Sequence, residues 1–175
     1  VSLNHATPAA FYAKQAKRDD YYDIALDYSR QHFDFLGGGG FKNPRGTDGD
    51  RPHIHEVLRQ RGYHIVDSVK GFRALKPATP NVIAVNEMLD ADAAMPFELD
   101  RPRDQLRLSD YTDKAIEVLD NPRGFFLMVE GGKIDWSSHA NDFVATMHEV
   151  LEFDRAIERA LAWYHRHPRQ TLIVV

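Results

Sequence analysis

A carboxylate, two glycines and a carboxylate–imidazole pair make up the part of the sequence best suited to chemistry. The apolar run 125–129 ends abruptly at Glu130, and two glycines follow. Asp135 and His139 lie four positions apart, so one turn of a helix can direct both side chains toward one ion. Carboxylate and imidazole ligands suit zinc, whereas carboxylate and hydroxyl ligands suit magnesium. A surface turn with ordinary polar residues gives the same spacing, so the pattern alone leaves both interpretations open.

These side chains need a frame, and the sequence predicts strands that alternate with helices. Such alternation indicates an α/β fold with a mostly parallel sheet, in which functional groups collect beyond the carboxyl ends of the strands. Glu130 follows a predicted strand directly. We expect strands at 33–36, 63–66, 81–85, 125–129 and after Pro168, and helices at 7–18, 21–29, 52–61, 109–119 and 140–165.

Local signals set several of these boundaries. Thr7 followed by Pro8 is typical of a helix N-cap with proline at the first helical position. Ser109 predicts the N-cap of a later helix. The glycines 37–40 close the first strand, because glycine permits backbone geometry that other residues resist.

The composition is that of an ordinary globular protein and excludes several kinds of site. The chain has 175 residues, enough for one domain, and a net charge of −4 without a basic tract argues against a nucleic-acid partner. No apolar run is long enough to cross a bilayer, and no signal-peptide pattern opens the chain. The absence of cysteine excludes disulfides and cysteine-ligated zinc. His53 and His55 are two positions apart and do not share a helix face, so we expect them at the surface.

Several segments of the chain, taken in order, resemble the alkaline phosphatase family. The stretch Val129–Asp135 together with His139 is similar to the family's metal-binding signature, and several matches in the correct order are more specific than one. The resemblance spans nearly the whole chain and implies a three-layer α/β/α sandwich with a mostly parallel sheet, incomplete at both ends. The other similar segments are His5–Ala10 with Arg18 after it, Leu36–Gly39, Met95–Arg101 and Glu149–Asp154.

The resemblance, carried over residue by residue, implies a role for each candidate. Glu130 and Thr7 match ligands of a magnesium ion, and Asp135 and His139 match two ligands of one catalytic zinc. Arg18 matches the arginine that grips the substrate phosphate, a role that suits the two parallel donors of a guanidinium group. Simple helix capping by Thr7 and a solvated helix end at Arg18 are the structural alternatives.

His5 and Trp136 stand at positions where the family varies. Some members have aspartate and others histidine at the position of His5, and aspartate favours tight magnesium binding. Trp136 stands where some members have lysine or histidine. It cannot place a cation beside the phosphate, although its indole N–H can donate one hydrogen bond. Packing at the rim of the pocket explains Trp136 equally well.

The reaction that the resemblance implies is hydrolysis of phosphate monoesters through a phosphoserine, at a centre of two zinc ions and one magnesium ion. This chain has no match to the family's Asp-Ser-Ala nucleophile segment, which lies upstream of His5. The Asp-His pair of the second zinc would follow Val175. Two protein ligands fall short of the three or four that zinc usually takes. We therefore expect the isolated chain to be inactive.

The ends of the sequence agree with that expectation. The chain starts at Val1, not at methionine, and the strand-like residues 171–175 have no turn after them. We expect residues 1–175 to form one internal fragment of a single catalytic domain. Because the family is commonly dimeric and exported, the resemblance implies a homodimer in the periplasm or outside the cell.

Three other functions remain as alternatives. The first is another enzyme of the same superfamily, such as a phosphodiesterase, a sulfatase or a cofactor-independent phosphoglycerate mutase. The second is a non-catalytic module that binds metal or phosphate. The third is a structural domain whose acidic residues and histidines merely occupy loops. The segment His5–Ala10 with Arg18 favours the phosphomonoesterase over the first alternative.

Overall fold

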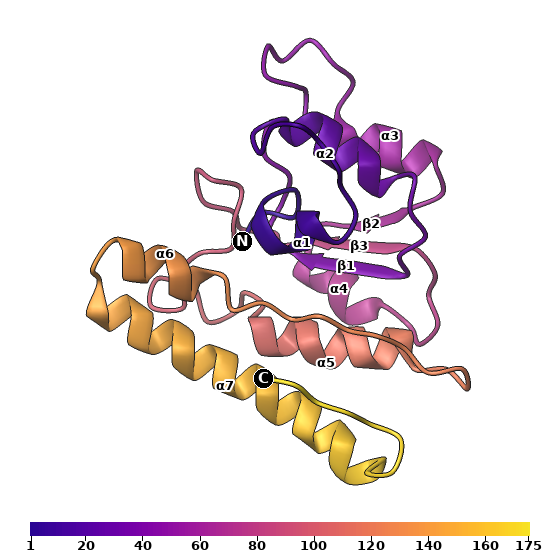
Figure 1. Ribbon diagram of the computed structural model, residues 1–175, viewed down its shortest axis with the longest axis vertical. Helices are drawn as coiled ribbons and strands as arrows, with labels where there is room; N and C mark the ends of the chain where they lie inside the picture. Colours follow the sequence, from indigo (N-terminus) through magenta and orange to yellow (C-terminus); the bar gives the residue numbers. More distant parts are fainter. The chain divides into compact units, whose positions relative to one another are not determined.

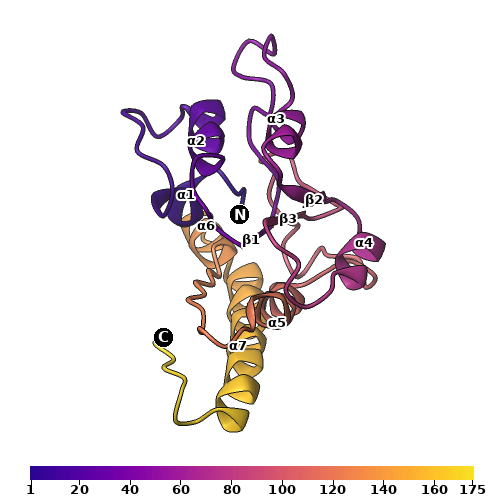
Figure 2. The same cartoon turned by 90° about the vertical axis from the view of Figure 1, so that its right-hand side faces the viewer.

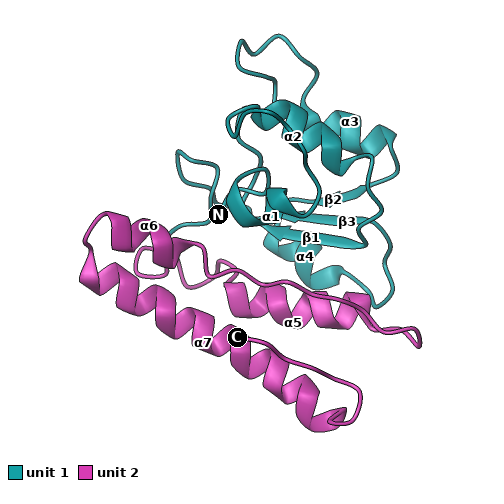
Figure 3. Cartoon of the chain, in the orientation of Figure 1, with its two compact units in different colours: residues 1–96 teal, residues 97–175 magenta.

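The computed structural model describes residues 1–175, which divide into two compact units. Unit 1 comprises Val1–Pro96 and unit 2 comprises Phe97–Val175 (Figure 3). Unit 1 contains all the strands, whereas unit 2 contains helices and extended segments (Figure 1). That residues 1–175 belong to one catalytic domain stays a prediction.

The sheet of unit 1 has three parallel strands in the order β1-β3-β2. The central strand contributes Ile83, which lies opposite Leu36 on one side and Ile65 on the other. Every residue of that strand is buried, as expected for a strand of a parallel sheet that is covered on both faces. The predicted α/β fold with a parallel sheet is therefore confirmed. The strands are β1 (Phe35–Gly38), β2 (His64–Val66) and β3 (Val82–Val85).

Four helices of unit 1 cover the two faces of this sheet. Helices α1, α2 and α3 lie on one face and α4 on the other, so helices, sheet and helix form three layers (Figure 2). The core between α2, α3 and the sheet contains the fully buried side chains of Tyr28, Ile54, Leu58 and Ile83. The helices are α1 (Ala6–Ala10), α2 (Tyr21–Tyr28), α3 (Ile54–Gln60) and α4 (Val69–Ala74).

The first helix is much shorter than predicted. It begins after His5, which is the N-cap, so Thr7 lies within the helix and is not its cap. It ends at Ala10, and the chain then turns back, because the buried Tyr12 hydroxyl donates to the carbonyl of Leu3 at 2.6 Å. The predicted helix as far as Arg18 is therefore wrong.

Two other boundaries differ from the prediction. β1 starts at Phe35, not Phe33, and includes the first two glycines of the run 37–40. Helix α4 was not predicted, although Ser68 gives it an N-cap whose side chain accepts the N–H of Gly71 at 3.2 Å. A serine three residues before a glycine is a weak signal, and this one lies in a stretch without clear apolar periodicity.

The run of glycines after Leu36 allows three backbone segments to meet. A Cβ on Gly39 would lie 2.5 Å from the carbonyl oxygen of Val1 and 2.6 Å from that of Ala93. The N–H of Gly39 donates to Val1 and that of Gly40 donates to Ala93. Only a residue without a side chain permits this approach.

Unit 2 is organised around one long helix. Both α5 and α6 pack against α7, whose N-cap Asp142 accepts the N–H of Ala145 at 2.9 Å (Figure 1). Ser109, predicted as the cap of α5, instead lies inside that helix and is buried. The helices are α5 (Leu108–Leu119), α6 (Lys133–His139) and α7 (Phe143–Arg166).

The two strands predicted in unit 2 are not formed. Residues 125–129 and 171–175 pair with no strand, and Phe126, Leu172 and Val174 are exposed. A strand needs the N–H and C=O groups of a neighbour, and unit 2 contains no strand that could supply them. None of the helices in either unit combines the length and apolar character needed to cross a membrane.

Candidate metal and phosphate site

Asp135 and His139 lie side by side on α6. Asp135 Oδ1 is 3.4 Å from His139 Nε2, and the two side chains are 70% and 82% exposed. Two adjacent ligands of a tetrahedral zinc, each about 2.0 Å from the metal, lie about 3.3 Å from one another. The separation of the two atoms is therefore close to that of two ligands of one zinc ion.

The inner face of α6 is held by buried contacts. Ser137 is fully buried, its hydroxyl donates to the carbonyl of Lys133 at 2.9 Å, and it accepts the hydroxyl of Thr146 on α7 at 2.9 Å. The turn before α6 is equally tight, because a Cβ on Gly131 would lie 3.1 Å from the ring of Phe153 on α7. These contacts fix the helix that carries the two candidate zinc ligands.

Lys133 makes a further contact of α6, and the sequence analysis predicts no role for this residue. Its side chain is buried, and its Nζ lies 4.0 Å from the ring centre of Phe97 and 4.6 Å from that of Trp136. Trp136 is half-buried, so the structure places its ring in a packing contact with a cation. Its position on the phosphate side stays a prediction. The sequence does contain a signal for this contact, because a lysine three positions before a tryptophan lies on the same face of a helix.

Glu130 has a buried oxygen that lacks a hydrogen-bond partner. The atom is Oε2, and it is among the few buried side-chain polar atoms of the chain that no donor reaches. A buried carboxylate oxygen without a donor is unfavourable by about 1–3 kcal/mol. A divalent cation would satisfy it, so the environment of Glu130 fits the predicted metal ligand.

Thr7, His5 and Arg18 belong to unit 1. Arg18 lies in a turn between α1 and α2, and its Nη2 is 3.4 Å from Nε2 of His5. A guanidinium group can only donate, so the imidazole nitrogen accepts. Burial, followed by the positive charges of Arg18 and Lys42, lowers the pKa of His5 below its usual value. The structure therefore brings a neutral imidazole next to the exposed guanidinium, while the side chain of Thr7 is exposed.

The candidates do not form a complete metal site within this chain. No group of three or more histidine, aspartate or glutamate side chains is arranged to hold an ion. Asp135 and His139 lie side by side, and the zinc that the resemblance implies for them stays a prediction. The magnesium role of Thr7 and Glu130 stays a prediction.

The pair His53 and His55 differs from its predicted surface position. The ring of His55 is half-buried, 5.8 Å from the ring centre of Phe41, and burial lowers its pKa to about 4. His53 accepts the N–H of His55 through Nδ1 at 3.2 Å and so caps α3. These two histidines are structural.

Comparison with known proteins connects these features to one family. The family model described as alkaline phosphatase matches residues 1–175. Alkaline phosphatase 3 of Bacillus subtilis is 35% identical over 98% of this chain and 37% of its own length. The tissue-nonspecific alkaline phosphatase of Gallus gallus is 35% identical over 99% of this chain and 40% of its own length.

Solved structures agree with the sequence relatives. The cold-active alkaline phosphatase of Shewanella sp. superposes with a TM-score of 0.78 at 30% identity, over 95% of this chain and 39% of that enzyme. The Thermus thermophilus alkaline phosphatase superposes with a TM-score of 0.80 at 29% identity, over 95% of this chain and 35% of that enzyme. The chain thus spans less than half the length of these relatives, and it belongs to the alkaline phosphatase family.

Proposed function

We propose that this chain is part of an alkaline phosphatase that hydrolyses phosphate monoesters. The observation that carries the proposal is the Asp135–His139 pair, 3.4 Å apart, within a chain that the family model matches from end to end. The pair has the ligand types and the spacing that two ligands of one catalytic zinc would have. Phosphate esters are the substrates that the family name gives to the relatives.

The metal ions would be held as follows. Asp135 and His139 would supply two zinc ligands, and Glu130 and Thr7 would supply magnesium ligands. The buried oxygen of Glu130 supports its role. A variant of the alkaline phosphatase from the Antarctic bacterium TAB5, in which a histidine is replaced by glutamate, contains Mg in its M3 site, so a member of this family can hold that ion. When bound, such ions stabilise negative charge on phosphate oxygens as Lewis acids.

Arg18 would bind the substrate phosphate. Its guanidinium group is exposed, and the neighbouring His5 is neutral, so the positive charge is available to an anion. Two parallel N–H donors match two phosphate oxygens. His5 would orient the guanidinium by accepting one of its other hydrogen bonds.

The remainder of the active centre would come from outside this sequence. The chain contains two of the three or four ligands that a zinc ion usually takes, and it has no Asp-Ser-Ala segment. We infer that residues 1–175 are part of one longer catalytic domain and that the chain alone is inactive. A homodimeric, periplasmic or extracellular enzyme is the corresponding proposal for the whole protein.

The test uses the full-length protein encoded around this sequence, assayed with p-nitrophenyl phosphate. Asp135→Asn is expected to remove about one zinc per chain and to lower kcat/KM by about 100-fold or more, because one ligand of the ion is lost. Asp113→Asn, an exposed carboxylate on α5, is the matched control and is expected to change neither quantity. Unchanged zinc content and activity in Asp135→Asn would overturn the proposal.

The substrate class is tested by a panel of monoesters, diesters and sulfate esters. The proposed function requires that monoesters have the highest kcat/KM. A preference for diesters or sulfate esters would point to another enzyme of the superfamily. Absence of all three activities in the full-length protein, with metal bound, would point to a non-catalytic module.

A further inference from the structure

Asn4 is a fully buried amide that connects three separate backbone segments of unit 1. Its exposed fraction is 0%, and it directly precedes His5. Its Nδ2 donates to the carbonyl of Tyr21 at 2.8 Å and to that of Lys42 at 3.0 Å. Its Oδ1 accepts the N–H of Lys42 at 2.8 Å. All the hydrogen-bonding groups of this side chain, apart from one oxygen lone pair, are therefore used on backbone atoms.

The segment that contains Asn4 is itself fixed. The N–H of Leu3 donates to the carbonyl of Gly40 at 2.7 Å, and the carbonyl of Leu3 accepts the hydroxyl of Tyr12 at 2.6 Å. Leu3 and Asn4 are 1% and 0% exposed. The backbone at Asn4 is therefore held in place, and its side-chain amide connects this segment to those of Tyr21 and Lys42.

The segment that contains Arg18 is held at its two ends. At the start, Asp27 Oδ2 accepts the N–H of Lys14 at 3.2 Å and Nε2 of Gln15 at 2.7 Å. At the end, the Tyr21 carbonyl accepts the Asn4 amide, three residues after Arg18. Arg18 lies between these two attachments in a turn, without a helix or strand to fix it.

We propose that Asn4 is a positioning residue for phosphate binding, because its amide sets where the Arg18 guanidinium lies relative to His5 and Thr7. The inference rests on the proposed role of Arg18. When the two N–H donors of Asn4 are lost, the carbonyls of Tyr21 and Lys42 lose a buried donor, and the Tyr21 end of the turn is no longer tied to the residue that precedes His5. Displacement of a substrate-binding group by about 1 Å can lower a rate by about 100-fold.

The test compares the inhibition constant of inorganic phosphate in four forms of the full-length enzyme. These are the unmodified enzyme, Asn4→Asp, Arg18→Ala and the double variant. Asn4→Asp keeps the size and the acceptor for Lys42 but has no N–H donors. We expect Asn4→Asp to raise the inhibition constant about tenfold, comparable to the loss of a hydrogen bond to a charged group.

The double variant separates positioning from general stability. If Asn4 acts through Arg18, Asn4→Asp raises the constant less than about twofold in the Arg18→Ala background, because coupled residues are not additive. The same tenfold rise in both backgrounds would overturn the inference.

Hydrogen exchange gives a readout independent of activity. The amide hydrogens of Lys42 and of the peptide 15–24 are expected to exchange faster in Asn4→Ser than in the unmodified enzyme. Asn4→Ser also takes the place of Asn4→Asp in the inhibition assay if Asn4→Asp does not fold.

Tyr63→Phe is the matched control. It removes a buried hydroxyl that donates to the carbonyls of Tyr28 and Gln31 but leaves the Tyr21 and Lys42 contacts of Asn4 intact. It is expected to lower the melting temperature without changing the inhibition constant. An equal rise of the constant in Tyr63→Phe would overturn the inference. If the unmodified enzyme and Arg18→Ala bind phosphate equally well, the proposed role of Arg18 fails. If only Asn4→Asp has no effect, the inference fails while that role stands.

Discussion

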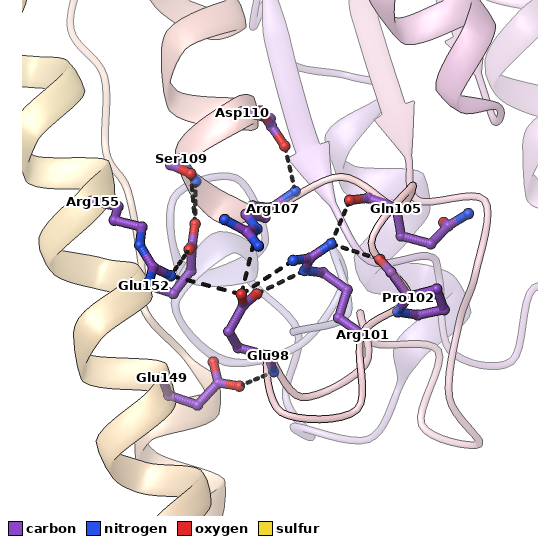
Figure 4. A network of polar contacts seen from close by, with 10 residues as sticks. All are labelled: Glu98, Arg101, Pro102, Gln105, Arg107, Ser109, Asp110, Glu149, Glu152 and Arg155. Carbon is purple, nitrogen blue, oxygen red and sulfur yellow. Dashed lines mark hydrogen bonds and ion pairs between the residues drawn. The ribbon is translucent and has the colours of Figure 1, made fainter.

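Glu152 and Ser109, 43 positions apart, form a buried carboxylate–serine contact that joins α7 to α5. Glu152 Oε1 accepts the N–H of Ser109 at 2.9 Å and its hydroxyl at 2.7 Å (Figure 4). The other oxygen of Glu152 accepts Nη1 of Arg155 at 3.0 Å. The carboxylate thus satisfies a free N–H in the first turn of α5, as a capping residue would, but from another helix.

Removal of this carboxylate is expected to destabilise unit 2. Glu152→Ala leaves the Ser109 N–H and hydroxyl buried without an acceptor, so we expect the free energy of unfolding to fall by about 2–4 kcal/mol. Urea denaturation followed by circular dichroism measures the change. Glu158→Ala, at an exposed position of the same helix, is expected to change it by less than about 0.5 kcal/mol. Equal effects of the two substitutions would contradict this role.

Gly39→Ala is expected to be strongly destabilising. The added Cβ would lie 2.5 Å and 2.6 Å from two backbone oxygens, and neither can move without shifting its own segment. We expect a loss of about 2–3 kcal/mol from overpacking, measured by thermal denaturation. At Gly49 nothing lies within 4 Å of an added Cβ, and φ is +72°, so Gly49→Ala should be unfavourable by only about 1–2 kcal/mol. A smaller loss at Gly39 than at Gly49 would be inconsistent with the close approach.

The sequence predicted the elements whose signals are local. The strand Val82–Val85 is a short apolar run between polar residues, and the helical spacing of Asp135 and His139 was enough to place both on one face of α6. The metal and phosphate roles came from the order of the motifs. The family match confirms the family, and the roles stay predictions. These features depend on residues near one another in the chain.

The errors occurred where distant contacts decide the structure. The first helix ends early, where the Tyr12 hydroxyl donates a hydrogen bond to the carbonyl of Leu3. No residue near Ala10 predicts this end of the helix. The apolar runs near Phe126 and Leu172 have strand patterns, but a pattern cannot supply a neighbouring strand. The contacts of Asn4 have no local signal for the same reason, because its partners lie 17 and 38 positions away.

His55 is expected to make the stability of unit 1 sensitive to acid. Burial lowers the pKa of His55 to about 4, whereas in the unfolded chain it titrates near 6.5. Between these values the unfolded state binds more protons, so stability falls as the pH decreases from about 6.5 to about 4. In His55→Phe this part of the pH dependence is expected to disappear. Urea midpoints at pH 7.5, 6, 5 and 4 measure it. His32→Phe, at an exposed position, is the control, and an unchanged slope in His55→Phe would contradict the prediction.

Lys133 is expected to hold α6 through its contact with the ring of Phe97, which lies outside the helix. Its Nζ lies 4.0 Å from the centre of the Phe97 ring and 4.6 Å from that of Trp136, in a side chain that is only 5% exposed. A desolvated cation over a ring is favourable by about 2 kcal/mol. Lys133→Met keeps the length of the side chain but removes the charge, so we expect lower thermal stability. In the full-length protein we also expect faster loss of the zinc ion that we propose for Asp135 and His139. Lys133→Arg keeps the positive charge and should leave the thermal stability and the rate of zinc loss close to those of the unmodified protein. The control is Arg166→Met, an exposed residue 5.6 Å from the Trp163 ring, which should change neither quantity. If Lys133→Met releases zinc no faster than Arg166→Met, the cation does not position α6.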